Sequence, residues 1–212
     1  MAILSEDHIE QIVIQEFIDL GYSYVNGADI SPDGAAQERE YDEVVLKHRL
    51  RAAIAKQNPT VPADAQEDAI KKLLRSDSPN LFQNNYTIHK YLTEGVDVEY
   101  RKGDRIVGDK VWLIDYQNPT NNEFLVVNQF TIIENQANKR PDVILFVNGL
   151  PLVVIELKNP ADENATLGTA FSQLQTYKQV IPSLFTYNGL LVISDGLEAK
   201  AGTISAGMSR FM

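Results

Sequence analysis

Apolar side chains recur with a helical period up to about residue 95. The first apolar stripe follows Ser5, a residue type favoured at helix N-caps, and stops at Gly21, a residue type that favours helix ends. It consists of Ile9, Ile12, Val13, Phe17 and Leu20. Prolines separate three further predicted helices, at about 38–57, 62–75 and 79–93.

After residue 95 the apolar period changes to two, which predicts β-strands. The candidate strands are Val96–Lys102, Val111–Tyr116, Phe124–Glu134, Asp142–Val147, Leu152–Lys158 and Gly189–Ser194, with a helix over Leu167–Val180 before the last strand. This order predicts an α/β fold in which helices flank a central mixed β-sheet. We expect one compact domain, with a helical N-terminal part over 1–95 and a strand-rich part over 96–212.

The composition is that of a globular protein. The 212 residues are 44% hydrophobic and 23% charged, which excludes a mostly disordered chain and a coiled coil. No apolar run approaches the ~20 residues of a membrane span, and the first residues lack the pattern of a signal peptide, so we expect a cytoplasmic protein. The absence of cysteine excludes thiolate metal sites and a cysteine nucleophile. From the abrupt end at Met212 we expect a fragment of a longer chain.

The net charge of -10 comes entirely from the first fifth of the chain. Residues 1–43 contain eleven acidic side chains and one base, Arg39, whereas the rest of the chain has eighteen of each sign. Phosphate binding needs clustered Lys and Arg, so a DNA substrate would require a local basic patch or a partner. The local candidates, for which solvated helix faces are the favoured explanation, are Lys47, Arg49, Arg51, Lys56, Lys71, Lys72 and Arg75.

Two familiar site patterns do not match this sequence. Gly103 and Gly108 have the spacing of a phosphate-binding P-loop, but Asp109 precedes Lys110 and no Ser or Thr follows the lysine, so we expect a hairpin loop. The three histidines share no segment and no i,i+4 spacing, which argues against a three-histidine zinc site.

The segment 140–160 is the most informative part of the chain. Two apolar runs flank Asn148-Gly149, a strong hairpin signal, and each run is apolar on both faces, as in a central strand covered by helices on either side. Charged residues are out of place in such strands. Glu156 and Lys158 are two residues apart, so they point to one face of the strand while Leu157 points to the other.

The loop at the hairpin tip decides whether Asp142 joins them. A two-residue loop places Asp142 opposite Ile155 and across the sheet from Glu156. A three-residue loop, Asn148–Leu150, places Asp142 directly opposite Glu156 and on the face of Lys158. A functional site requires the second register, which a type I turn with a bulge would give.

Two facing carboxylates repel each other unless a cation lies between them. Lys158 could neutralise them alone, which would be a purely structural role. The chemistry favours a magnesium ion, because Mg²⁺ takes oxygen ligands and completes its shell with water and substrate phosphate. Asp142, Glu156 and the main-chain carbonyl of Leu157 would be its ligands, with Mn²⁺ as a substitute. Lys158 would then orient or deprotonate the attacking water, or stabilise the transition state of phosphodiester hydrolysis.

The same segment resembles a known family. Pro141-Asp142 followed by Glu156-Leu157-Lys158 at a strand end is similar to the PD-(D/E)XK nuclease signature. The surroundings are more specific, and together they resemble the N-terminal nuclease region of the restriction (R) subunit of type I restriction endonucleases. The resemblance covers essentially the whole chain and is strongest from about Trp112 to Arg210. The matching stretches are Ile114–Pro119, Asn121–Phe124, Val127–Phe130, Asn148–Val153, Glu156–Pro160 and Ser194–Gly196.

This resemblance implies a PD-(D/E)XK restriction-endonuclease-like fold with its catalytic core in 96–212, and magnesium-dependent cleavage of double-stranded DNA. It also implies a longer subunit, whose further domains use ATP to translocate DNA, and separate specificity and modification (methyltransferase) subunits. By motif match, Asp142 and Glu156 would be metal ligands and Lys158 the catalytic lysine.

Three further candidates follow from the resemblance. The family has a Gln-xxx-Tyr motif, matched by Gln173 and Tyr177, which share a helix face and could position DNA or the catalytic strand. The alternative is that Tyr177 only packs in the core. Many PD-(D/E)XK nucleases add a carboxylate from the first helix, for which Glu10 is the first choice and Glu6 the second. The alternative for Glu10 is a solvated acid in the first helical turn.

Two other functions stay open at this point. One is a degenerate nuclease fold that serves the complex as a non-cleaving DNA-binding or assembly module, although the intact Asp142, Glu156 and Lys158 favour catalysis. The other is a stand-alone PD-(D/E)XK repair nuclease with the same site.

Overall fold

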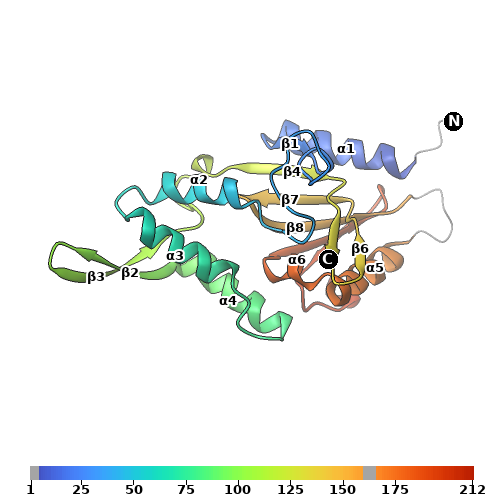
Figure 1. The fold of residues 1–212 in the computed structure, drawn as a ribbon. Coiled ribbons are helices and arrows are strands. Elements are labelled where there is room, and N and C mark those ends of the chain that lie inside the picture. The colour runs from blue at the N-terminus through green and yellow to red at the C-terminus, as the bar shows by residue number, and fades with distance from the viewer. Residues whose placement is uncertain (1–4, 160–165) are drawn as a thin grey trace.

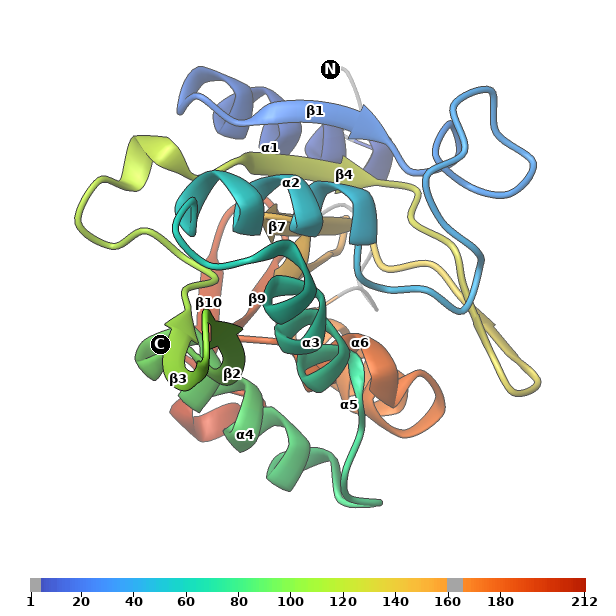
Figure 2. The same ribbon diagram turned by 60° about the vertical axis from the view of Figure 1, so that its left-hand side comes forward.

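A six-stranded mixed sheet forms the centre of the protein, with helices on both of its faces (Figures 1 and 2). The computed structural model describes residues 5–159 and 166–212. In sheet order the strands are β1 (Ser23–Asn26), β4 (Phe124–Asn128), β7 (Val143–Val147), β8 (Leu150–Leu157), β9 (Leu190–Ser194) and β10 (Ala199–Gly202). β1 is parallel to β4 and β8 to β9, and the other neighbours are antiparallel. The predicted α/β class with a central mixed sheet is therefore confirmed.

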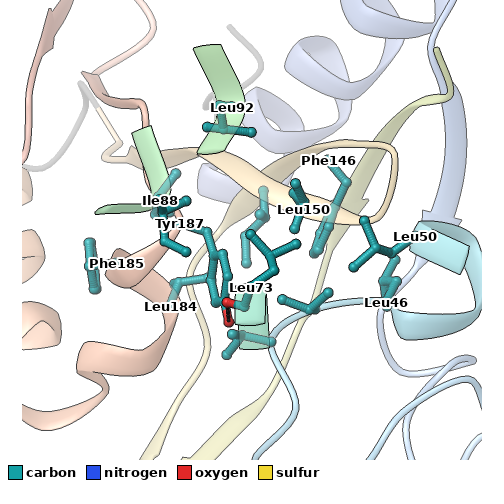
Figure 3. Packing of buried hydrophobic residues seen from close by; sticks show 14 of the residues in the cluster. Leu46, Leu50, Leu73, Ile88, Leu92, Phe146, Leu150, Leu184, Phe185 and Tyr187 are labelled. Atoms are coloured by element: carbon teal, nitrogen blue, oxygen red, sulfur yellow. Dashed lines mark hydrogen bonds between the residues drawn. The ribbon is translucent and has the colours of Figure 1, made fainter. Parts of the chain in front are cut away.

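The helices divide between the two faces of the sheet. They are α1 (Glu6–Asp19), α2 (Lys47–Gln57), α3 (Ala63–Leu74), α4 (Leu81–Glu94), α5 (Leu167–Val180) and α6 (Pro182–Thr186). α1 packs on one face, where Ile9 and Ile14 are buried with Val143 and Ile155. The alternate side chains of the same strands enter a larger core with α2 to α6, part of which is shown in Figure 3. The central strands are apolar on both faces, as predicted, because both faces are covered.

Two small hairpins lie outside the main sheet. They are β2 (Val96–Lys102) with β3 (Arg105–Val111), and β5 (Ile132–Glu134) with β6 (Ala137–Lys139). Short 3₁₀ turns occur at Pro119–Asn121 and Met208–Arg210. The segment around Gly103 forms the turn of the first hairpin, which confirms the expected hairpin loop. Among the described residues, no helix is both long enough and apolar enough to cross a membrane.

Several predicted elements are confirmed in detail. α1 begins after the predicted N-cap, Ser5, whose hydroxyl accepts a hydrogen bond from a main-chain N–H of the first turn. α5 has the predicted bounds. The strand predicted over Phe124–Glu134 is divided into β4 and β5, because Gln129 has a φ of 54° and interrupts the extended chain.

Two predicted elements are wrong. The strand expected over Val111–Tyr116 instead ends at its first residue, because the side chain of Asn58 pairs with both the main-chain N–H and the carbonyl of Trp112. The Asp115 carboxylate then bends the chain by accepting hydrogen bonds from the N–H groups two and three residues ahead. The helix expected over 38–57 begins only at Lys47. The segment before Lys47 is irregular because Arg39 holds its carbonyl groups in other hydrogen bonds.

Arg39 is a buried cation that connects two distant segments. It is 2% exposed, and its guanidinium donates hydrogen bonds to the main-chain carbonyls of Glu40, Glu43 and Thr131. The guanidinium carbon lies 3.6 Å from the ring centre of Phe130. Burial lowers the pKa of Arg39 to about 10. These contacts attach the loop before α2 to the chain between β4 and β5.

The turn between β7 and β8 is tight and packed. Asn148 and Gly149 have φ angles of 53° and 79°, the two positive values that a type I′ turn requires. The fully buried Asn148 side chain accepts a hydrogen bond from the main-chain N–H of Glu123 and donates one to the carbonyl of Leu113. A Cβ at Gly149 would lie 2.5 Å from the carbonyl oxygen of Leu46. Only glycine fits this approach to the start of α2 without a shift of the backbone.

Arg39→Met should lower the free energy of unfolding by about 2 kcal/mol or more, since the carbonyls of Glu43 and Thr131 lose their donor and each unpaired group costs roughly 1–3 kcal/mol. The Glu40 carbonyl keeps the main-chain N–H of Glu43 as a donor. Chemical denaturation followed by circular dichroism measures the change. Arg51→Met is the control, because Arg51 is exposed and its ion pair with Glu67 contributes ~1 kcal/mol at most. Equal stability of the two variants would contradict the role given to Arg39.

Gly149→Ala should destabilise the protein by at least ~2 kcal/mol more than Gly103→Ala. Both glycines have a positive φ in a hairpin turn, so both variants carry backbone strain of roughly 1–2 kcal/mol. An added Cβ meets nothing within 4 Å at Gly103 but meets the Leu46 carbonyl at Gly149. Urea unfolding of both variants gives the difference, and a value near zero would show that the close approach relaxes without cost.

Candidate active site

A bulge in β8 sets which residues face each other at the far end of the β7–β8 pair. The pairs next to the turn follow the two-residue register, but an extra residue at Leu152 shifts the rest, and Val143 pairs with Ile155. The next residues outward, Asp142 and Glu156, are therefore opposite each other. The expected three-residue loop is wrong, because the turn has two residues. The register expected from it is confirmed, because the bulge adds the missing residue.

The two facing carboxylates are largely removed from water. Glu156 is fully buried, and its Oε2 has no hydrogen-bond partner. Asp142 Oδ2 accepts a hydrogen bond of 2.6 Å from the main-chain N–H of Leu157. Burial, and then the charge of Asp142, raise the pKa of Glu156 to about 8. Burial also raises the pKa of Asp142 to about 6. The pair therefore has less positive charge around it than two ionised carboxylates need.

Lys158 contributes one positive charge to this pair. Its Nζ donates hydrogen bonds to Glu156 Oε1 (2.8 Å) and to the carbonyl of Leu157 (2.9 Å), and it lies 3.6 Å from Glu6 Oε1 of α1. Burial acts to lower the pKa of Lys158, but the hydrogen bond to Glu156 and the surrounding carboxylates outweigh it and raise the pKa above its usual value. Lys158 is thus a protonated donor at neutral pH.

The first helix places Glu10 within electrostatic reach of Asp142. Glu10 is 8% exposed, which excludes the alternative of a solvated acid. Its carboxylate accepts hydrogen bonds from the side-chain amides of Asn128 (2.6 Å) and Gln129 (3.3 Å) at the end of β4. Tyr24 of β1 donates a hydrogen bond of 3.0 Å to Asn128. The charge of Glu10 contributes to the raised pKa of Asp142, so the two groups interact electrostatically.

Asn128, Gln129 and Tyr24 are site residues that the sequence reasoning missed. In the sequence, the signal for Asn128 and Gln129 is that two adjacent polar residues end an otherwise apolar strand. The side-chain contacts of this pair with Glu10 have no sequence signature, because α1 and β4 are far apart along the chain.

α5 covers the face of the sheet on which Glu156 lies. Gln173 donates a hydrogen bond of 2.6 Å to the Tyr177 hydroxyl, as their i,i+4 spacing predicts. Tyr177 is 5% exposed and belongs to the larger core. Burial, followed by the charge of Glu156, raises the pKa of Tyr177. The structure thus places Tyr177 both in the core and within the electrostatic reach of Glu156.

The donor atoms of this site fit a hard divalent cation. Asp142 and Glu156 present carboxylate oxygens, and Glu156 Oε2 is buried and has no hydrogen-bond partner. Leu157, which follows Glu156 on β8, adds a main-chain carbonyl. Mg²⁺ is commonly held by one or two carboxylates together with water and substrate phosphate. Among the described residues, no group of three or more His, Cys, Asp or Glu side chains is arranged to hold a metal.

The basic side chains singled out on the helices are engaged within the protein. Ion pairs join Lys47 to Glu43, Arg49 to Glu38 and Glu123, Arg51 to Glu67, Lys71 to Asp68, and Arg75 to Asp77, while Lys56 and Lys72 donate to main-chain carbonyls. Each of these bases therefore has an internal partner, an acid for five of them and a main-chain carbonyl for Lys56 and Lys72.

Comparison with known proteins gives close sequence relatives. The family model "Type I restriction enzyme R protein N terminus" matches residues 3–210. The type I restriction enzyme HindI endonuclease subunit of Haemophilus influenzae is 42% identical over 98% of this chain and 20% of its own length. A Methanocaldococcus jannaschii protein, provisionally named the type I restriction enzyme MjaIXP endonuclease subunit, is 36% identical over 99% of this chain and 20% of its own length. The type I restriction enzyme EcoprrI endonuclease subunit of Escherichia coli is 26% identical over 92% of this chain and 58% of its own length.

These matches confirm the family resemblance seen in the sequence. The chain spans about a fifth of the length of the first two relatives. The family model covers almost all of the chain, including every element of the candidate site. The chain belongs to the family of type I restriction enzyme R protein N termini.

Proposed function

We propose that this chain is a DNA-cleaving nuclease domain of the PD-(D/E)XK type that acts within a type I restriction-modification enzyme. The observation that carries the proposal is the pair of facing carboxylates, the half-buried Asp142 just before β7 and the fully buried Glu156 on β8. Lys158 donates to one oxygen of Glu156, and the other oxygen of Glu156 has no partner. The single charge of Lys158 leaves the pKa of both carboxyls raised and one Glu156 oxygen without a partner, so the pair fits a metal-dependent reaction better than a purely structural role. The relatives are named endonuclease subunits, which agrees with this function.

In this proposal Asp142, Glu156 and the Leu157 carbonyl hold Mg²⁺. When bound, the ion would lower the pKa of a bound water and offset the charge of the scissile phosphate. Lys158 is protonated and donates hydrogen bonds to oxygen atoms of the same site. It is therefore suited to orient a water molecule or to stabilise negative charge that develops on the phosphate.

Three further residues support the site in this proposal. Glu10 adds negative charge beside Asp142, which would strengthen cation binding. Tyr177 is buried within electrostatic reach of Glu156, and Gln173 donates a hydrogen bond to the Tyr177 hydroxyl. Gln173 is only half-buried and keeps a second amide N–H, with which it can donate to a DNA phosphate.

We infer the wider enzyme from the family resemblance and not from this chain's own residues. Double-stranded DNA would be delivered by ATP-driven translocase domains outside these 212 residues. Specificity and modification (methyltransferase) subunits would recognise and methylate the DNA site. We assign no ATP site to this chain, and we place the assembled enzyme in the cytoplasm.

Asp142→Asn and Glu156→Gln should each abolish Mn²⁺ binding by the purified chain, because each removes one of the two proposed carboxylate ligands. The enhancement of water-proton relaxation by Mn²⁺ measures this binding. Asp68→Asn is the matched control, since Asp68 is exposed on α3 and pairs with Lys71. In the assembled restriction enzyme, the same two variants should also lose Mg²⁺-dependent cleavage of plasmid DNA.

Each of the other outcomes has a distinct meaning. Mn²⁺ binding that survives both substitutions would sink the metal-site assignment. Metal binding by the unaltered chain without cleavage in the assembled enzyme would identify a non-cleaving DNA-binding or assembly module. Cleavage without the specificity and modification subunits would identify a stand-alone nuclease.

In the metal-free protein, Glu156 should make the folded state less stable as the pH rises. Its pKa is about 8 in the fold against an ordinary 4.5, so ionisation is opposed in the fold, and stability falls by roughly 1 kcal/mol per pH unit between these values. Glu156→Gln resembles the protonated group and should be the more stable protein near pH 8. Urea unfolding in EDTA, from pH 6, where the Asp142 pKa lies, up to pH 8, measures the effect. Parallel pH profiles for both proteins would contradict it.

A further inference from the structure

The β2–β3 hairpin carries free basic side chains at its tip. The last pair of the ladder is Lys102 with Arg105, and Gly103-Asp104 forms the turn, with a φ of 62° at the glycine. Arg101, Lys102 and Arg105 are exposed, and none of their side chains has a hydrogen bond or ion pair within the described part of the chain. Three bases and one acid give the tip a net charge of +2.

Folding does not explain this arrangement. Lys102 and Arg105 are directly opposite on one face of the hairpin, where like charges destabilise the pair. Nearer the base of the same hairpin, the opposite-charge rule is followed: Lys110 faces Asp97, and their charged atoms are 3.1 Å apart. The tip therefore keeps two facing cations without an acid to neutralise them.

The tip also differs from the basic residues of α2 and α3. Those residues are held in ion pairs or donate to carbonyls, so an external anion would have to break an internal contact to reach them. Nothing has to be broken at the hairpin tip. In a chain with a net charge of -10, this is a surface on which an external anion meets net positive charge.

The hairpin holds its tip away from the body of the protein. Its base is anchored by Val96, Val98 and Val111, which are buried in the larger core, while its far end projects beyond the helices (Figure 1). A two-stranded ribbon fits the major groove of DNA, and Lys and Arg side chains on it reach the phosphates. Ile106, 75% exposed and paired with Arg101, adds an apolar contact for sugar or for a thymine methyl group.

We propose that Arg101, Lys102 and Arg105 at the hairpin tip contact backbone phosphates of double-stranded DNA, at a surface separate from the carboxylate site. The hairpin and the C-terminal end of β8 lie on opposite sides of the molecule in Figure 1. The tip therefore holds a duplex at a distance from the bond that is cleaved. This inference rests on the DNA substrate of the proposed function.

The test removes the three charges together, with Arg101→Gln, Lys102→Gln and Arg105→Gln in one variant of the whole chain. Fluorescence anisotropy follows the binding of a labelled DNA duplex in EDTA over a range of salt concentrations. Each phosphate contact contributes about 0.9 to the slope of log K against log salt. The slope should fall by about 2 to 3, and the Kd at low salt should rise at least ~10-fold.

The control variant combines Arg51→Gln, Lys71→Gln and Arg75→Gln. It changes the net charge equally, but its three bases are exposed and already paired with acids. The control should keep the slope of the unaltered chain. Circular dichroism should be the same for both triple variants, because neither set of side chains packs in the core. Their urea midpoints should differ little, because exposed charge pairs contribute ~1 kcal/mol at most.

Three results would overturn the hairpin contact: an unchanged slope, equal losses in the hairpin and control variants, or no binding by the unaltered chain at low salt. A hairpin that serves an acidic protein would give the first of these. Since EDTA removes metal, Asp142→Asn should keep the slope. If the hairpin variant lowers the slope but the unaltered chain binds no Mn²⁺, the hairpin contact is supported and the nuclease assignment is overturned. If the slope is unchanged but the chain binds Mn²⁺, the nuclease assignment is supported and the hairpin contact is overturned.

Discussion

The extra residue in β8 is the constraint on which the candidate site depends. The type I′ turn fixes the first pairs of the hairpin, and without the bulge Asp142 would lie across the sheet from Glu156. Pro151 lies beside the bulge, one of the few places where a central strand tolerates a residue without an N–H. The carbonyl of Leu152 accepts a hydrogen bond of 2.7 Å from the N–H of Gly189, so the start of β9 satisfies the displaced backbone.

The same register creates an electrostatic cost that the fold must offset. Asp142 and Glu156 share one nearby ammonium group, and the pKa of each carboxyl is raised. The strands that carry them are buried by α1 on one face and by α5 on the other, and apolar burial contributes roughly 25 cal/mol per Å². Two apolar layers can therefore support an unfavourable polar pair between them. A local conflict of this kind within well-packed strands is typical of functional sites.

Features with local signals could be predicted from the sequence, and those that depend on distant contacts could not. The bounds of α5 and the cap at Ser5 follow from periodicity and residue type. β1 was missed because a four-residue strand that pairs in parallel with the distant β4 has no period of its own. In the site, Glu156 and Lys158 stand out as charges in an apolar strand. The contacts of Glu10 with the β4 amides depend on how α1 packs across the sheet, which no local pattern contains.

The distribution of charge follows from the fold in the same way. The acidic first fifth of the chain is partly neutralised from within, since Glu38 pairs with Arg49 and Glu43 with Lys47. These ion pairs join α2 to the loop that Arg39 anchors, so the basic side chains of the helix stabilise the fold. A count of clustered Lys and Arg points first to the helices, because pairing cannot be read from composition. An external anion instead meets the basic side chains that the fold leaves unpaired with acids. In the described part of the chain, these include the bases at the tip of the β2–β3 hairpin.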